Sequence, residues 1–238
     1  MKKVALLGYR GFLGRALNNV LETETKIHLV KIDRKKFNSG NFDKNVDFAI
    51  NCAMPSARFW AENNPKLDFI ETVKKTHDII DSFPNSKIIQ ISSISARTQQ
   101  HKVYGRNKRA AEMLLDKNKH LIFRLGPLYG ENLSKGVIID LIKNQTVYVS
   151  GKSKYGFTDI NWVSKMIVNN INLFGIVELG AKGYVSLLNL KNKLSSNSEF
   201  CGEIDNQIFT KIYCDKNSLS HDSEVNDFAK KIKITNKS

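Results

Sequence analysis

Short apolar runs alternate with amphipathic stretches through the first half of the chain. The apolar runs lie at 4–7, 27–32, 48–52, 88–91 and 121–125. Few polar residues interrupt them, which is typical of parallel strands that are buried on both faces. Between the first two runs, Phe12, Leu17 and Leu21 recur at helical spacing. The repeated order of strand, helix and strand predicts βαβ units and an α/β fold with a doubly wound parallel sheet.

The second half of the chain is less regular. We expect a helix around 136–143, a strand at 146–149 and a helix around 160–173. No low-complexity linker separates these elements from the first half. The expected architecture is a sheet domain over 1–130 and a small C-terminal lobe over 131–238, packed together as one compact unit.

The composition excludes several classes of protein. Hydrophobic residues make up 41% of the chain, and no apolar stretch approaches the length of about 20 residues that a membrane helix needs. Cys52, Cys201 and Cys214 are widely spaced and form no metal-ligand cluster. We therefore expect a soluble, cytoplasmic protein with no metal and no membrane partner. The net charge is +14, but no basic run is interleaved with aromatic residues, so we do not expect a nucleic-acid partner.

A glycine-rich turn directly follows the first apolar run. Residues 8–14 read Gly-x-x-Gly-x-x-Gly and lead straight into the first predicted helix. Glycines let the backbone turn sharply and approach a pyrophosphate, whose charge meets the free N–H groups of the helix N-terminus. Because the turn lies between a strand and a helix, it indicates a dinucleotide-binding sheet of the Rossmann type. The residues expected to contact the cofactor here are Gly8, Arg10, Gly11, Phe12, Leu13 and Gly14.

The end of the second apolar run bears on the choice between NAD and NADP. Asp33 follows this run at the position where an acid would hydrogen-bond the adenosine ribose hydroxyls. Arg34 comes next, and Arg10 lies in the glycine turn, where a cation would meet a 2′-phosphate. A carboxylate that faced this phosphate would repel it. We therefore narrowly favour NAD over NADP, with Asp33 and Arg34 as further cofactor contacts.

One predicted helix carries a pair of residues with acid–base chemistry. Tyr104 and Lys108 stand at i and i+4, one turn apart on the same face. A nearby ammonium stabilises a phenolate, so we expect Lys108 to lower the pKa of Tyr104 from its ordinary value of about 10. Ser92 and Ser93 end the preceding apolar run, where a hydroxyl would hydrogen-bond the same substrate oxygen. This set predicts proton transfer at a hydroxyl or a ketone.

Taken in order, these motifs resemble those of the extended short-chain dehydrogenase/reductase family. The resemblance covers about residues 1–175 and implies a C-terminal lobe that binds the substrate. It rests on the glycine turn, on Asn51, Cys52 and Ala53, on Ser92 and Ser93, on Tyr104 and Lys108, and on the segment 124–130, which reads Arg-Leu-Gly-Pro-Leu-Tyr-Gly.

The resemblance implies a role for each matching residue. Tyr104 would be the acid and base, Lys108 would hold the nicotinamide ribose, and Ser93 would orient the substrate oxygen. Ser93 is preferred to Ser92 because the second residue at this strand end usually has that role in the family. The further cofactor contacts that the resemblance implies are Asn51, Cys52, Ala53, Pro127, Tyr104 and Lys108.

The implied function is that of an NAD(P)-dependent epimerase or reductase acting on a nucleotide-linked sugar. A dehydratase is less favoured, because Ile94 and Ser95 occupy the place of the Asp-Glu pair of that class. A homodimer is expected by analogy with the family alone. Two alternatives remain open: a non-catalytic NAD(P)-binding sensor or assembly protein of the same fold, and an RNA-binding relative, whose affinity would fall steeply with salt.

Three features depart from the family pattern. The segment between Asp33 and the third run is too short for the usual strand and helix. Thr72 stands where the family usually has an asparagine. No arginine follows Arg124, although enzymes of this family commonly clamp the substrate diphosphate with C-terminal arginines.

Overall fold

Buried aliphatic strands form one sheet in the first part of the chain. The computed structural model describes residues 1–180, 182–209 and 222–235. The strands of this sheet are β1 (Lys2–Leu7), β2 (Ile27–Ile32), β3 (Phe48–Asn51), β4 (Lys87–Ser93), β5 (Leu121–Leu125) and β9 (Gly175–Leu179). Their order is β2-β1-β3-β4-β5-β9, and the first five strands pair in parallel. The predicted parallel sheet is confirmed.

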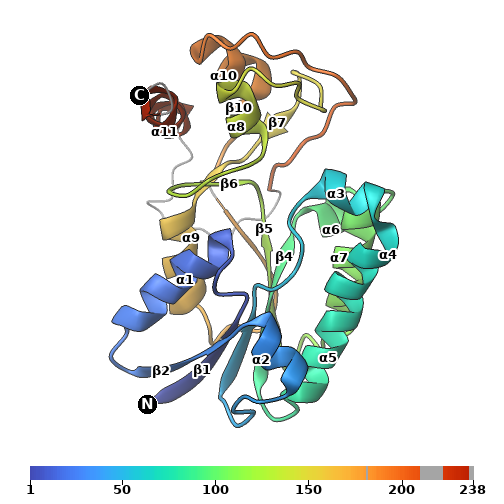
Figure 1. The fold of residues 1–238 in the computed structure, drawn as a ribbon, viewed down its shortest axis with the longest axis vertical. Helices are drawn as coiled ribbons and strands as arrows, with labels where there is room; N and C mark the ends of the chain where they lie inside the picture. The colour runs from blue at the N-terminus through green and yellow to red at the C-terminus, as the bar shows by residue number, and fades with distance from the viewer. Residues whose placement is uncertain (181, 210–221, 236–238) are drawn as a thin grey trace. The chain divides into compact units, whose positions relative to one another are not determined.

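Helices cover both faces of this sheet, with α1 and α9 on one side and α4, α5 and α7 on the other (Figure 1). The arrangement confirms the doubly wound α/β fold of the Rossmann type. The helices of this part are α1 (Phe12–Thr23), α2 (Arg34–Ser39), α3 (Arg58–Asn63), α4 (Pro65–Phe69), η1 (Ile70–Lys74), α5 (Lys75–Ser82), α6 (Ser95–Thr98), α7 (Val103–Met113) and α9 (Ile160–Asn169).

Burial follows the position of each strand in the sheet. All residues of β3 and β5 are buried, as their mostly apolar sequences predict, and the two polar ones, Asn51 and Arg124, have hydrogen-bond partners. The prediction that β2 is buried on both faces is wrong, because β2 is the edge strand and only its last residue, Ile32, is fully buried. The short segment after β2 contains α2, a single helix of 6 residues.

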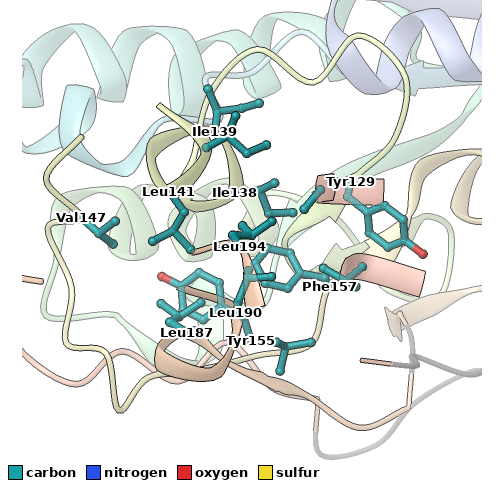
Figure 2. Close-up of a cluster of buried hydrophobic side chains, with 14 residues drawn as sticks. Tyr129, Ile138, Ile139, Leu141, Val147, Tyr155, Phe157, Leu187, Leu190 and Leu194 are labelled. Atoms are coloured by element: carbon teal, nitrogen blue, oxygen red, sulfur yellow. The ribbon is translucent and has the colours of Figure 1, made fainter. Parts of the chain in front are cut away.

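A second group of elements has a hydrophobic core of its own. Its elements are β6 (Leu128–Tyr129), α8 (Val137–Ile142), β7 (Lys154–Tyr155), β8 (Thr158–Asp159), β10 (Val185–Ser186), α10 (Leu187–Lys193) and α11 (Asp222–Thr235). Figure 2 shows Ile138 and Leu141 of α8 packed with Leu190 of α10 and with Tyr155 and Phe157. The strand predicted at 146–149 is wrong, since Val147 forms only an isolated bridge to Phe200.

The chain divides into two compact units. The first contains residues 1–125 and 161–178, and the second contains 126–160 and 179–238. The domain boundary expected at residue 130 stays a prediction. In the part of the chain that the structure describes, no helix combines the length and the apolar character needed to span a bilayer. Among the same residues, no group of three or more His, Cys, Asp and Glu side chains could hold a metal ion. Cys214 lies outside the described residues.

Candidate active site

The sequence motifs of the first unit meet at one edge of the sheet. The glycine turn follows β1, Asp33 follows β2, Cys52 follows β3, and Ser92 and Ser93 end β4. These four strands run in parallel, so their carboxyl ends share an edge. Ligands of doubly wound sheets bind at this edge.

A side chain would obstruct the backbone of the glycine turn. Gly8 has a φ of +80°, and a Cβ added to it would lie 2.7 Å from the carbonyl carbon and oxygen of Cys52. A Cβ on Gly14 would lie 2.1 Å from the carbonyl oxygen of Gly8. Within the described residues, no side chain caps α1 at Gly11 and no acid occupies its first turn. The first N–H groups of α1 are therefore available to donate hydrogen bonds to an anion at the positive end of the helix dipole. This arrangement suits the pyrophosphate of a dinucleotide.

Asp33 and two arginines lie near the end of β2. Asp33 caps α2, and its Oδ1 accepts a hydrogen bond of 2.9 Å from the N–H of Lys36. This hydrogen bond, together with Arg10 at 3.3 Å from Oδ2, lowers the pKa of Asp33. Arg34 donates instead to both carboxylate oxygens of Glu71, at 2.8 and 3.0 Å. Arg10 and Asp33 thus lie together, whereas the guanidinium of Arg34 is bound by Glu71 of η1.

The residues after β3 lie against the glycine turn. The N–H of Cys52 donates to the carbonyl oxygen of Leu7 at 3.0 Å. The buried Asn51 donates from Nδ2 to Oε1 of Gln90 at 2.9 Å, and its Oδ1 accepts from the N–H of Ala53 at 3.0 Å. Burial raises the pKa of the Cys52 thiol, so this thiol stays neutral at physiological pH.

Ser92 and Ser93 have different partners, because consecutive strand residues point to opposite faces of a sheet. Ser92 donates to Oε1 of Glu112 at 2.7 Å. Glu112 in turn accepts two hydrogen bonds from Arg124, at 2.9 and 2.6 Å. The side chain of Ser93 is hydrogen-bonded to Tyr104. Ser93 therefore lies beside the tyrosine, whereas Ser92 belongs to a buried ion-pair network.

Tyr104 and Lys108 lie one turn apart on the buried face of α7. Only 7% of Tyr104 and 4% of Lys108 is exposed. The Nζ atom of Lys108 is 5.3 Å from the centroid of the Tyr104 ring. The structure thus brings together the tyrosine, the lysine and the serine that the sequence pattern singles out.

Burial changes the pKa of both members of this pair. It raises the pKa of Tyr104 to about 12, against the smaller lowering effects of the Ser93 hydrogen bond and the Arg58 charge. It lowers the pKa of Lys108 to about 8, although the negative charge of Asp68 acts in the opposite direction. The expectation that the pKa of Tyr104 lies below its ordinary value is wrong, because desolvation of the phenolate outweighs the contributions that lower this pKa. At neutral pH the pair is a phenol and an ammonium.

Asp68 of α4 is a polar residue beside this pair that the sequence pattern did not single out. Its side chain is fully buried, and its Oδ2 accepts a hydrogen bond of 2.8 Å from Asn107 of α7. Its Oδ1 and the buried Oγ1 of Thr72 have no hydrogen-bond partner among the residues that the structure describes. Thr72 lies in the π-helical turn η1, and such turns are frequent at functional sites. No local pattern in the sequence singles out Asp68, because its contact with Asn107 joins two helices that are far apart along the chain.

Pro127 belongs to the second unit, where its carbonyl oxygen accepts a hydrogen bond of 3.0 Å from the N–H of Thr158. Its contact with a cofactor stays a prediction.

Solved structures of similar fold include enzymes named for nucleotide sugars. A mutant of UDP-glucuronic acid 4-epimerase from Bacillus cereus, in complex with UDP-4-deoxy-4-fluoro-glucuronic acid and NAD, is 18% identical, with a TM-score of 0.79 and coverage of 97% of this chain and 99% of that one. dTDP-4-dehydrorhamnose reductase from Bacillus anthracis, in complex with NADP, is 17% identical, with a TM-score of 0.74 and coverage of 98% and 99%. MoeE5 in complex with UDP-glucose and NAD is 15% identical, with a TM-score of 0.80 and coverage of 100% of both chains.

At this level of identity the likeness concerns the fold. The chain has the fold of the extended short-chain dehydrogenase/reductases, and the resemblance predicted from its motifs is confirmed at that level. The matches span nearly the whole length of both chains, so the second unit shares in the likeness. No protein-family model matches the sequence, and no curated protein matches it.

Proposed function

We propose that this chain is an NAD(P)-dependent epimerase or reductase that acts on a nucleotide-linked sugar. The observation that carries the proposal is that Ser93 is hydrogen-bonded to the buried Tyr104, with the buried Lys108 one helical turn further along α7. The solved structures of similar fold support it, because they are named as an epimerase and a reductase of such sugars and hold NAD or NADP.

In this proposal Tyr104 exchanges a proton with an oxygen of the substrate. Its pKa is raised to about 12, so at neutral pH it is a phenol that can donate a proton to a ketone oxygen. Ser93 hydrogen-bonds the same oxygen and orients it. The ammonium of Lys108 stabilises the phenolate that remains after the transfer. These protonation states favour the ketone-reducing step, which a reductase performs and which completes the cycle of an epimerase.

The cofactor in this proposal is a nicotinamide dinucleotide, which supplies or accepts a hydride when it is bound. The glycine turn holds its pyrophosphate and Lys108 its nicotinamide ribose. We keep NAD as the narrowly favoured form, because the pKa of Asp33 is lowered and its carboxylate stays ionised at the end of β2. An ionised carboxylate there disfavours a 2′-phosphate, while the nearby Arg10 acts in the opposite direction.

The test compares cofactor binding with turnover in one pair of variants. We expect Tyr104→Phe to lower turnover of UDP- or dTDP-linked sugars by about 10²–10⁴-fold, the usual contribution of acid–base catalysis, while leaving dinucleotide affinity nearly unchanged. Tyr148→Phe changes an exposed tyrosine and serves as the control. Binding is read from the thermal midpoint, because a ligand at about 100 times its dissociation constant adds roughly 2.7 kcal/mol.

Each result decides between the alternatives. Turnover that survives in Tyr104→Phe contradicts the assigned role of the tyrosine. Dinucleotide binding without turnover of any sugar nucleotide favours a non-catalytic sensor or assembly protein. A chain that binds neither NAD nor NADP contradicts the whole proposal.

A further inference from the structure

A network of hydrogen bonds between buried side chains lies beside the loop that follows β3. This loop packs on the glycine turn, because a Cβ added to Gly8 would lie 2.7 Å from the carbonyl group of Cys52 and 2.8 Å from the Cα of Ala53. Asn51 ends β3 directly before the loop, and Gln90 of β4 is its neighbour across the sheet. Both side chains are fully buried. The amides of these two residues are therefore placed to hold the loop.

A backbone group at each end of this network fixes the direction of its hydrogen bonds. The N–H of Ala53 can only donate, so the atom of Asn51 that it meets at 3.0 Å is the acceptor Oδ1. Nδ2 of Asn51 then donates to Oε1 of Gln90 at 2.9 Å, and Nε2 of Gln90 donates to Oγ1 of Thr76 at 3.1 Å. The Thr76 hydroxyl donates in turn to the carbonyl oxygen of Thr72 at 2.7 Å, which can only accept. Neither amide can turn over without losing hydrogen bonds.

The same network also reaches Met54, the next residue of the loop. Nε2 of Gln90 lies 3.0 Å from the sulfur of Met54, and the Thr76 hydroxyl lies 3.8 Å from it. A thioether is a weak acceptor, so these contacts orient the side chain of Met54 more than they stabilise the fold. Gln90 thus holds the loop at two places, at Ala53 through Asn51 and at Met54 directly.

We propose that Gln90 is a positioning residue for the dinucleotide site. Through Asn51 and Met54 it keeps the loop 52–54 packed on the glycine turn, and it thereby sets the affinity for the cofactor. This inference rests on the proposed function, because it requires the glycine turn to bind a dinucleotide. A turn whose neighbouring loop is displaced for part of the time binds more weakly, in proportion to the fraction of molecules in which the site is formed.

Fluorescence titration with NADH or NADPH, whichever the wild type binds more tightly, tests this role at a temperature at which circular dichroism shows each variant to be folded. We expect Gln90→Leu to bind at least about 10-fold more weakly, which corresponds to a site that is formed in about one molecule in ten. Thr76→Val leaves Nε2 of Gln90 without its hydroxyl acceptor and should bind at least about fivefold more weakly. Thr76→Ser keeps this hydroxyl and should bind within about twofold of the wild type.

The matched control removes another hydroxyl from the same helix. Ser82 of α5 donates to the carbonyl oxygen of Asp78 at 2.7 Å, as Thr76 does to that of Thr72, but it lies outside the network. Ser82→Ala should therefore change the dinucleotide affinity by less than about twofold. Urea unfolding of every variant separates a loss of stability from a loss of affinity in the folded chain.

The outcomes distinguish this inference from the proposed function. If the wild type binds neither dinucleotide, the proposed function fails and the inference fails with it. If the wild type binds and Gln90→Leu binds as tightly, the network serves the fold alone, and only the inference is overturned. Equal losses of affinity in Thr76→Val and Thr76→Ser overturn it as well, because the hydroxyl is then not their cause. If Gln90→Leu does not fold, the two Thr76 variants carry the comparison.

Discussion

Replacing Lys108 with methionine should abolish turnover and yet stabilise the folded chain near neutral pH. The reason is that burial lowers the pKa of Lys108 from 10.5 to about 8, so the folded state holds this proton less tightly than the unfolded state does. Methionine has a similar length and carries no charge to desolvate. A residue that serves the proposed chemistry therefore weakens the fold that contains it.

The size of this effect follows from the pKa shift. A shift from 10.5 to about 8, at about 1.36 kcal/mol for each pKa unit, corresponds to about 3 kcal/mol. The folded pKa is the lower one, so the unfolded chain binds the proton first as the pH falls from 10.5, and the whole penalty is present below about 8. We expect Lys108→Met to be more stable by about 3 kcal/mol near pH 7 and by about 1 kcal/mol near pH 10.

Urea unfolding of the wild type and of the variant at these two pH values measures the difference. Lys66→Met replaces an exposed lysine of α4 and should change stability by less than about 0.5 kcal/mol at both pH values. If Lys108→Met is no more stable than the wild type near pH 7, burial of the Lys108 ammonium does not destabilise the fold. The difference in the free energy of unfolding should also become smaller as the pH rises. A difference that stays constant with pH would arise from packing and not from the charge of Lys108.

Three further predictions follow from contacts in the first unit. Glu112→Gln should destabilise the fold by about 3 kcal/mol in urea unfolding, because it removes the closer of the two carboxylates that pair with the buried Arg124 and leaves only Glu178, at 3.8 Å. Asp78→Asn, in an exposed pair, should cost less than about 1 kcal/mol. Asp68→Asn removes a charge that raises the pKa of Lys108, so turnover should be lost at a lower pH on the alkaline side of the pH–rate profile; an unchanged profile would contradict this. Gly14→Ala should weaken NADH binding, followed by fluorescence, by at least about 10-fold, since its Cβ would lie 2.1 Å from the carbonyl oxygen of Gly8.

Local patterns were sufficient for the strands that lie inside the sheet. The boundaries of β5 agree with its run of mostly apolar residues, as expected of a strand that is buried on both faces, and its one charged residue, Arg124, is paired with Glu112. The run at 27–32 has the same composition, yet β2 is an edge strand, and that depends on the order of strands that are distant in sequence. The apolar run at 146–149 forms no strand, because Val147 has only a single bridge to Phe200.

The candidate site was predictable where it depends on spacing along one element. Tyr104 and Lys108 lie on one face because they are one helical turn apart, and Ser92 and Ser93 diverge because they are neighbours in a strand. The contact of Asp68 with Asn107 joins two helices that are far apart in sequence, and no local pattern encodes it. The protonation states of Tyr104 and Lys108 were not predictable either, because they depend on burial.

The buried face of α7 carries one residue that destabilises the fold, Lys108, and one that fastens the helix to the sheet, Glu112. Burial of Lys108 as an ammonium destabilises the folded state, and this cost exists only if α7 remains packed on the sheet. Glu112, one turn beyond Lys108 on the same face, binds both Ser92 of β4 and Arg124 of β5. These contacts fasten α7 to two strands of the sheet. We therefore expect the ion pair of Glu112 with Arg124 to help keep Lys108 buried, against the cost of burying its charge.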